Sequence, residues 1–271
     1  RDRARGLDPT HHGLLPVLTL MLRFLTAGES HGSHLVAILE GMPAGVPIDV
    51  AHLAREMRRR QLGYGRGPRM QFETDPAEIV SGVRRGTTLG SPIAMLIKNK
   101  DASIDRLPVV TRPRPGHADL TGAIKYDHRD IRNVLERASA RETTARVAVG
   151  AVCKQLLSPL GIELASHVIA LGSVRAKASA ATVALLRKKA ESNPVRCLDA
   201  AATKKMIKEI DACVKAGDTL GGVFEVLAEG VPPGVGSYVH YDRRLDAILG
   251  RAILSIHAVK AVEVGDGVAA A

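Results

Sequence analysis

The chain has 271 residues, which is enough for one large domain or two ordinary ones with a sizeable core. Its 45% hydrophobic and 24% charged residues are typical of a globular protein. No apolar run approaches the roughly 20 residues that cross a bilayer, and the stretch from Leu14 to Leu25 is interrupted by Arg23. That stretch also lacks the pattern of a signal peptide, so we expect a cytoplasmic protein without a membrane partner.

The formal net charge of +10 admits nucleic acid or a small polyanion as the partner. Bases stack on aromatic side chains, but the chain has no Trp and only 3% aromatic residues, which favours the small molecule. The cysteines Cys153, Cys197 and Cys213 are an odd number without CxxC spacing, which argues against a disulfide framework and a zinc site. Cys213 shares a helical face with Met206 and Ile210, so we expect it in the core.

The two ends of the chain differ from its middle. Residues 1–20 are irregular and rich in Arg, His and Pro, and regular patterning begins at Met21. We expect residues 1–20 to be an extension outside the fold. At the other end, residues 261–264 predict a strand and residues 265–267 a turn, after which the chain stops. We therefore expect residues 21–271 to form one domain that lacks its C-terminal segment.

In chain order, the first regular elements are two short apolar segments and a helix. Residues 22–26 predict a strand that runs into a glycine-bracketed loop, and residues 35–39 form a second apolar segment. Asp49 is suited to cap a helix that ends at Gly63. The apolar positions of that helix are Leu53, Met57 and Leu62.

Arginines accumulate at the end of this helix and in the loop that follows. Cations in a last helical turn complement the helix dipole, which accounts for residues 58–60 without any ligand. It does not account for residues 63–69, where glycines alternate with further arginines. Because glycine lets backbone N–H groups approach an anion and the guanidinium fork binds phosphate or carboxylate, we expect anion binding here. The loop is not a dinucleotide fingerprint, since no helix pattern follows it, and no P-loop motif occurs.

A second helix begins near Ser139, which heads an S-x-x-E capping box. Arg137 and Arg141 flank this helix start, which is therefore suited to an anion as well as to an ordinary cap. The apolar stripe of the helix comprises Thr144, Val147, Ala148, Ala151, Val152 and Leu156.

The last third of the chain continues the mixture of helices and strands. Asp199 caps a helix that ends at Gly217, residues 222–227 predict a mostly apolar strand, and residues 245–253 an amphipathic helix. No repeat or low-complexity linker divides the chain, so the predicted fold class is α+β. The lysine- and arginine-rich runs at 187–189 and 204–208 are interpreted as solvated helix faces.

Two histidines lie in glycine-punctuated loops among polar or charged neighbours. His31 belongs to residues 26–32 (TAGESHG) and His117 to residues 112–119 (RPRPGHAD). A lone histidine is more often structural than catalytic. Two in such loops, with arginine-rich stretches between and after them, point to acid–base chemistry on an anion.

These blocks, in this order, resemble the chorismate synthase family. The resemblance runs nearly continuously from Met21 to about Gly267. It rests on residues 23–32 (RFLTAGESHG), 58–67 (RRRQLGYGRG), 112–119 (RPRPGHAD), 136–143 (ERASARET), 216–222 (AGDTLGG) and 263–267 (EVGDG).

The resemblance implies a specific reaction and fold. The family converts 5-enolpyruvylshikimate 3-phosphate to chorismate, the last step of the shikimate pathway and so part of aromatic amino acid biosynthesis, by a 1,4-anti elimination of phosphate. The lyase requires reduced FMN (FMNH2) although nothing is oxidised overall. Its fold is a layer of helices between antiparallel sheets, assembled as a homotetramer. A substrate with two carboxylates and a phosphate suits a site rich in arginine.

The resemblance also implies the catalytic residues. His31 matches the histidine that gives a proton or hydrogen bond to the leaving phosphate, an effect worth on the order of a few kcal/mol. His117 matches the histidine that keeps the flavin in its productive protonation state. Ser30 is placed to orient His31 or to hydrogen-bond the substrate.

The binding residues follow in the same way. Arg60 and Arg66 match family positions that bind anionic groups of the substrate and cofactor, including NADPH in members that reduce their own flavin. Arg137, Ala138 and Ser139 match a stretch that contacts the flavin, consistent with the capped helix start. No residue is expected to bind a metal.

The chain departs from the family pattern in two places. After Gly267 the family carries much of its flavin pocket and an aspartate proposed as the base for the proton lost from substrate, and no residue here takes that role. His257 and Ala261 stand where the family often has proline and glycine. We therefore hypothesise that these 271 residues are not active alone.

Two other interpretations stay open at this point. A basic nucleic-acid-binding module would use residues 55–69 as its face and bind with a steep salt dependence. A catalytically inactive anion-binding subunit would keep His31 and His117 in separate environments.

Overall fold

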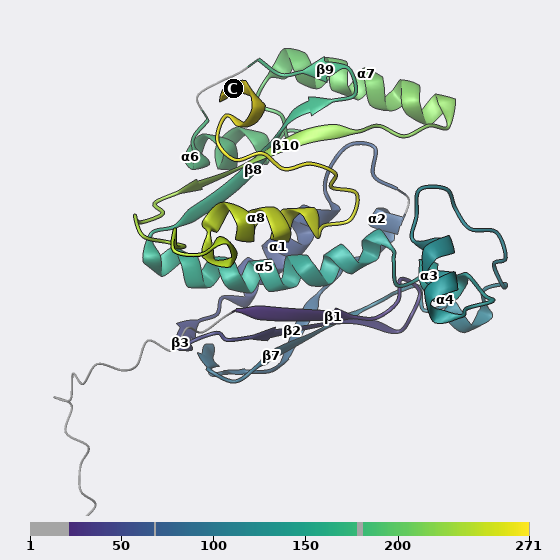
Figure 1. The fold of residues 1–271 in the computed structure, drawn as a ribbon, viewed down its shortest axis with the longest axis horizontal. Coiled ribbons are helices and arrows are strands. Elements are labelled where there is room, and N and C mark those ends of the chain that lie inside the picture. The colour runs from purple at the N-terminus through teal and green to yellow at the C-terminus, as the bar shows by residue number, and fades with distance from the viewer. Residues whose placement is uncertain (1–21, 68, 178–180, 271) are drawn as a thin grey trace, which may run out of the picture.

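The computed structural model describes residues 22–67, 69–177 and 181–270, and the extension predicted at residues 1–20 lies outside them. Three layers are visible in Figure 1: a four-stranded sheet, a layer of helices, and a second sheet. This is the predicted α+β arrangement, with helices between antiparallel sheets. The middle layer contains α1 (Val50–Gln61), α5 (Thr143–Leu157) and α8 (Leu245–Leu254).

The first sheet has the strand order β1-β2-β7-β4 and is antiparallel throughout. Along β2, Leu35, Ala37 and Leu39 are buried while the residues between them are more exposed, the period-2 pattern of a sheet covered on one face. The strand expected at residues 22–26 is thereby confirmed, and the apolar segment at residues 35–39 is a strand as well. The strands are β1 (Arg23–Ala27), β2 (His34–Glu40), β4 (Ala77–Ser81) and β7 (Ile93–Lys98).

Helices α1 and α5 pack on this sheet and form the main core with it. Asp49 caps α1 as predicted, its side chain accepting a hydrogen bond from the backbone N–H of Ala51 at 2.8 Å. Leu53 and Met57 are buried, but Leu62 is half exposed and forms the C-cap, so the helix stops one residue before the predicted Gly63. In α5 the predicted stripe faces the core, and its buried members include Thr144, Ala148, Ala151 and Val152.

The second sheet has the order β10-β8-β9 and carries α7 on its outer side (Figure 1). Helix α7 begins after its Asp199 cap and ends at Gly217 in the left-handed conformation, as the sequence predicts. Met206 is buried in this part, whereas Cys213 is only partly buried and lies outside the core cluster that Cys197 joins. The elements are β8 (Glu163–Leu171), β9 (Val174–Arg175), β10 (Gly222–Glu229) and α7 (Ala200–Ala216).

Smaller elements complete the described fold. A short sheet has the order β3-β6-β5, and α3 and α4 lie together at one end of the helical layer (Figure 1). None of the described helices is both long and apolar enough to cross a membrane. These elements are β3 (Ala44–Pro47), α2 (Arg69–Phe72), β5 (Val83–Arg84), β6 (Thr87–Leu89), α3 (Asp119–Tyr126), α4 (Arg132–Leu135) and α6 (Val183–Leu185).

Two sequence predictions differ from the structure. The strand expected at residues 261–264 is absent from the described residues: this segment is irregular and pairs with no strand, although the predicted turn at Gly265 and Asp266 is present. Residues 222–227 do form a strand, but β10 is largely exposed along its length because it is the edge of its sheet. An apolar pattern shows that other elements could pack on a segment, but it does not show that they do.

A cluster of ion pairs joins the end of α1 to residues 191–196, which lie on the side of the second sheet. Arg59 at the end of α1 donates two hydrogen bonds to Glu191, at 2.8 and 2.6 Å, and Arg196 donates two more at 2.8 and 2.6 Å. Burial alone would raise the pKa of Glu191, but the hydrogen bonds from Arg196 and Arg59 outweigh it and lower the pKa to about 2. The folded state therefore favours the charged carboxylate.

This cluster predicts an acid-sensitive contribution to stability. The carboxylate of Glu191 is ionised in both states at neutral pH, so its pairing contributes fully there. As the pH falls from the ordinary value of 4.5 to about 2, the unfolded chain takes up the proton first and the contribution is lost. We expect Glu191→Gln to destabilise the protein at pH 7 by about 1–2 kcal/mol after allowance for solvent screening, with a smaller difference in acid.

Thermal unfolding of both proteins across this pH range measures the effect. Glu163→Gln is the matched control, because Glu163 pairs with Arg187 at an exposed position and its loss should change the melting temperature little. A difference between wild type and Glu191→Gln that stays constant from neutral to acidic pH would contradict the prediction.

Candidate active site

The first glycine-bracketed loop joins β1 to β2 and presents Ser30 and His31. Gly28 is at φ +102°, and a Cβ there would lie 2.3 Å from the carbonyl oxygen of His34, so only glycine fits. Buried Asn99 holds the loop, its amide donating to the carbonyls of Gly32 at 2.7 Å and Glu29 at 3.2 Å. The backbone of the turn that carries Ser30 and His31 is therefore held in place by Asn99.

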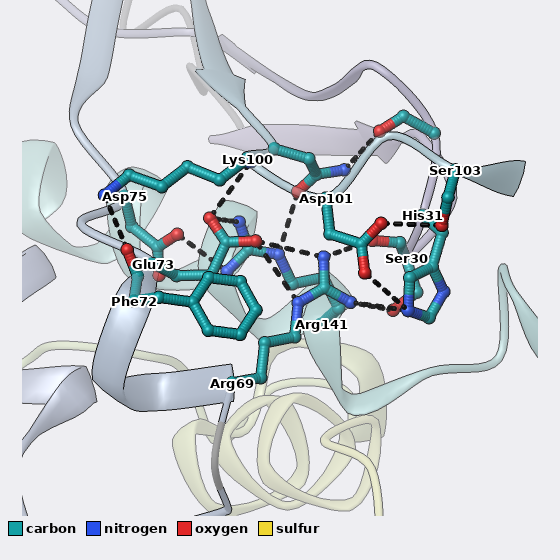
Figure 2. A network of polar contacts seen from close by, with 12 residues as sticks. Ser30, His31, Arg69, Phe72, Glu73, Asp75, Lys100, Asp101, Ser103 and Arg141 are labelled. Atoms are coloured by element: carbon teal, nitrogen blue, oxygen red, sulfur yellow. Dashed lines mark hydrogen bonds and ion pairs between the residues drawn. The ribbon is translucent and has the colours of Figure 1, made fainter.

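His31 lies among charged side chains from three other parts of the chain, and Figure 2 shows two of them, Arg69 and Asp101. Its Nδ1 is 2.8 Å from a carboxylate oxygen of Glu136. Its Nε2 is 3.3 Å from Arg69 Nη1 and 3.7 Å from Asp101 Oδ2. The ring is thus held at one nitrogen by a buried carboxylate, while the other nitrogen, Nε2, faces an arginine and a partly exposed aspartate.

Arginines from α1, α2 and the turn before α5 surround two buried carboxylates. Arg69 pairs with Glu73 at 3.1 Å and also donates to Ser30, to its hydroxyl at 2.9 Å and its carbonyl at 2.6 Å. Arg141 lies 2.6 Å from Asp75 and 3.5 Å from Glu73. Arg60, at the end of α1, lies 3.3 Å from the other oxygen of Asp75. Figure 2 shows the chain of contacts from Asp75 to His31 through Arg141, Glu73 and Arg69.

Positive charge is in excess within this cluster. Burial lowers the pKa of Arg60 to about 10, and although Asp75 opposes this, the repulsion from Arg141, Arg66 and Arg69 adds to it. Four guanidinium groups therefore act on one another with two buried carboxylates, Glu73 and Asp75, between them. Such a cluster attracts an anionic ligand, because the ligand relieves the repulsion.

The remaining predicted residues near this cluster have structural contacts. Arg66 is exposed in the glycine-rich loop, and its Nε donates to the carbonyl of Leu62 at 3.1 Å. Arg137 donates to the carbonyl of Thr26 at 2.7 Å and so braces the His31 loop. Ser139 caps the 3₁₀ turn Ala140–Glu142 by accepting from the N–H of Arg141 at 3.2 Å. The cap is as predicted, but the capping box is incomplete, because the Glu142 carboxylate accepts from Thr26 and Arg146 instead. Partly buried Ala138 lies between them.

His117 lies apart from His31. It is exposed on the loop before α3, and its Nδ1 is 2.9 Å from the carbonyl oxygen of Pro115 in the same loop. Arg114 fixes this loop by pairing with buried Asp119 at 2.9 Å. That hydrogen bond raises the pKa of Arg114, with a smaller contribution from Glu136, so the loop neighbours the carboxylate that holds His31. In the described part of the chain the two imidazoles make no contact with each other.

Several site residues were missing from the sequence prediction. Arg69 was noted only as the end of the basic loop and Arg141 only as a flank of the capped helix start, and the carboxylates Glu73, Asp75 and Glu136 were not selected. Buried carboxylates resemble surface residues in a sequence, since nothing local marks them. The one available indication was the i, i+4 spacing of Arg132 and Glu136, and of Arg69 and Glu73, which is typical of paired charges on a helix.

The fold and this site together suggest an enzyme that acts on an anionic substrate. Its helices lie between antiparallel sheets, and its arginines lie beside a histidine that can serve as a proton donor or acceptor. The comparisons with known proteins identify the family. The chorismate synthase family model matches residues 22–271. The chain belongs to the chorismate synthase family.

The individual relatives agree with the family match. The chain is 55% identical to chorismate synthase 2 of Bacillus cereus and 56% identical to the chorismate synthase of Geobacillus thermodenitrificans. Each alignment covers 92% of this chain and 68% of the relative. A crystal structure of a chorismate synthase superposes with a TM-score of 0.79 at 46% identity, covering 92% of this chain and 70% of the other. The nucleic-acid-binding and inactive-subunit interpretations are not favoured by these matches.

The excess charge predicts a stability change that an anion reverses. Replacing Asp75 by Asn removes one of the two buried carboxylates, and Asn suits the left-handed backbone there (φ +46°). Arg60 and Arg141 would then face each other with less compensation, so we expect a loss of about 3–5 kcal/mol of stability. Added phosphate should raise the melting temperature of Asp75→Asn more than that of wild type.

Unfolding curves with and without phosphate measure this difference. Asp246→Asn is the control, because Asp246 forms an exposed pair with Arg244 far from the cluster in sequence, and its loss should neither destabilise the protein much nor increase its response to phosphate. An equal response to phosphate in all three proteins would show that the arginine cluster does not attract anions.

Proposed function

We propose that the protein eliminates phosphate from 5-enolpyruvylshikimate 3-phosphate to form chorismate, the activity of the family to which it belongs. The observation that carries this proposal is the cluster of Arg60, Arg66, Arg69 and Arg141 around the buried carboxylates of Glu73 and Asp75, next to His31. The substrate carries two carboxylates and a phosphate, so its charge complements the excess. The donor set of guanidinium, hydroxyl and imidazole suits such oxygen anions.

Substrate binding is assigned to residues at the edge of the cluster. Arg60 and Arg66, both named from the sequence, would bind anionic groups of the substrate, and Ser30 would contribute its hydroxyl. The contacts support adding Arg69, because it reaches both the hydroxyl of Ser30 and the ring of His31. Each of these groups is part of a fixed network, which reduces the entropy lost when the substrate binds.

His31 is assigned the proton transfer to the leaving group. As the C–O bond to phosphate breaks, its electron pair goes to the phosphate oxygen, which takes the Nε2 proton of the doubly protonated His31 ring. The ring is left neutral, with its remaining proton on Nδ1. The support is geometric: Nδ1 is engaged by Glu136, so Nε2 is the nitrogen that faces Arg69 and a bound anion. General acid catalysis of this kind contributes about 10²–10⁴-fold.

Reduced FMN is proposed as the cofactor, with NADPH as a possible source of its electrons. The phosphate of FMN fits the same chemistry, since Arg60 and Arg66 offer guanidinium donors. Arg137, Ala138 and Ser139 would hold the flavin, and His117 would maintain its protonation state. When bound, reduced FMN supplies electron density to the reacting substrate without net oxidation.

Several broader expectations stay predictions. They are a single domain over residues 21–271, a homotetramer, a cytoplasmic location, and the inactivity of these 271 residues alone. An anaerobic assay of chorismate formation with reduced FMN tests the last of these directly.

The anion assignment is tested with two exposed arginines. Arg66→Ala should weaken binding of 5-enolpyruvylshikimate 3-phosphate about 10- to 100-fold, because a charge-assisted hydrogen bond is worth roughly 1.5–3 kcal/mol. Anaerobic calorimetry with and without reduced FMN measures this affinity. His31→Ala should leave binding within a few-fold of wild type, and in a version of the protein extended by the segment that the family carries after Gly267 it should abolish most chorismate formation.

Arg55→Ala is the matched control for Arg66→Ala. Arg55 is also an exposed arginine, but it lies on α1 and pairs with Asp49, the cap of that helix. The two substitutions change the net charge equally, so only a specific site distinguishes them. Equal weakening by both would reduce the effect to general electrostatics and overturn the assignment of Arg66.

A further inference from the structure

Glu136 is a fully buried carboxylate in direct contact with the ring of His31. It follows α4 as its C-cap, and its side chain has no exposed surface. One oxygen accepts from Arg132 Nη1 at 3.0 Å. The other accepts from the backbone N–H of His31 at 3.0 Å and lies 2.8 Å from Nδ1 of the same residue. A group of this kind is costly to bury, so its partners define what it does.

The backbone of Glu136 also contacts the loop that carries Ser30 and His31. Its carbonyl accepts from the N–H of Ser30 at 2.9 Å, so side chain and backbone together hold both Ser30 and His31. A carboxylate at the C-terminal end of a helix gains nothing from the helix dipole. An exposed carboxylate could pair with Arg132 equally well, so the pairing with Arg132 does not explain why Glu136 is buried. The arrangement is accounted for by what it does to His31.

We propose that Glu136 is a positioning residue for His31, fixing the neutral ring with its proton on Nδ1 and its free electron pair on Nε2. This inference rests on the proposed function for the role of His31 in catalysis. A carboxylate accepts but does not donate, so it selects the Nδ1–H form. The ring is then oriented with Nε2 towards Arg69 and Asp101, where a leaving phosphate would lie.

The charged groups around the ring are consistent with this role. Glu136 faces Nδ1, while Arg69 from α2 and Asp101 from the segment after β7 face Nε2. Arg132 compensates the charge of Glu136 directly, and Arg114 does so from the His117 loop. The ring therefore has one permanent carboxylate partner and one side whose partners are the exposed part of the site.

The first test is a direct observation of the ring. Nitrogen-15 NMR of the labelled imidazoles, at a pH where His31 is neutral, reports which nitrogen carries the proton. We expect His31 of the wild-type chain to be protonated mainly on Nδ1, and the population of the Nε2–H form to rise in Glu136→Ala. A wild-type ring protonated mainly on Nε2 would overturn the inference, whether or not the chain forms chorismate.

The second test uses Glu136→Gln, which keeps the size of the side chain and protects the fold if Glu136→Ala is unstable. In a version of the protein extended by the segment that the family carries after Gly267, we expect a fall in kcat of about 10- to 100-fold, the usual effect of losing a residue that orients a catalytic group, with KM changed less than about threefold. In a His31→Ala background the same substitution should change kcat less than about twofold, because Glu136 acts through the ring. An equal fold-decrease in kcat from Glu136→Gln in the wild-type and His31→Ala backgrounds would contradict the proposal.

Glu142→Gln is the matched control. Glu142 is also buried and also pairs with an arginine four residues away, Arg146 at 2.9 Å, but it contacts Thr26 rather than His31. It should lower stability comparably while leaving the His31 nitrogen spectrum as in wild type. Absence of chorismate formation with reduced FMN, assayed in a version of the protein extended by the segment that the family carries after Gly267, would contradict the proposed function alone, since the NMR result still decides the role of Glu136.

Discussion

The structure depends on the pairing of buried carboxylates with more guanidinium groups than they can neutralise. Glu73 and Asp75 have no exposed side-chain surface, and between them they contact Arg60, Arg69 and Arg141. These arginines come from the end of α1, from α2 and from the turn before α5, so the pairs join elements that are distant in sequence. Because a buried pair is seldom worth more than the apolar contacts that could replace it, function accounts for the cluster better than stability does.

The helical layer determines where this charge is held. Arg59 and Arg60 are neighbours in the last turn of α1, yet Arg59 pairs with Glu191 on the second sheet's side, and Arg60 turns to Asp75 and the carbonyl of Ala140. One turn of helix is therefore anchored on both sides. This anchoring depends on the capped and apolar face of α1, so the packing of Leu53 and Met57 against the first sheet indirectly sets the position of the site.

Much of the fold follows from local sequence patterns, whereas the site does so only in part. The helix limits at Asp49, Asp199 and Gly217 were predicted because a cap is a local event. The strand expected at residues 261–264 was wrong, since strands need a partner that no local pattern supplies. Basic loops could be selected from the sequence as candidate anion sites, but the buried carboxylates that pair with their arginines could not, because this pairing joins residues far apart in the chain.

The proposed binding of the substrate requires that the charge of the cluster be only partly neutralised. Without the buried carboxylates, Arg60, Arg69 and Arg141 would repel one another strongly enough to oppose folding. With a carboxylate for every arginine, a multiply charged substrate would gain little by entering. Glu73 and Asp75 lie between these limits, and Asp101, partly exposed beside Nε2 of His31, is the carboxylate that an incoming anion meets. The pKa of Asp101 is lowered, first by the hydrogen bond from Ser103 and further by His31 and Arg69, so its carboxylate is charged. It therefore competes with an incoming anion for the same cations.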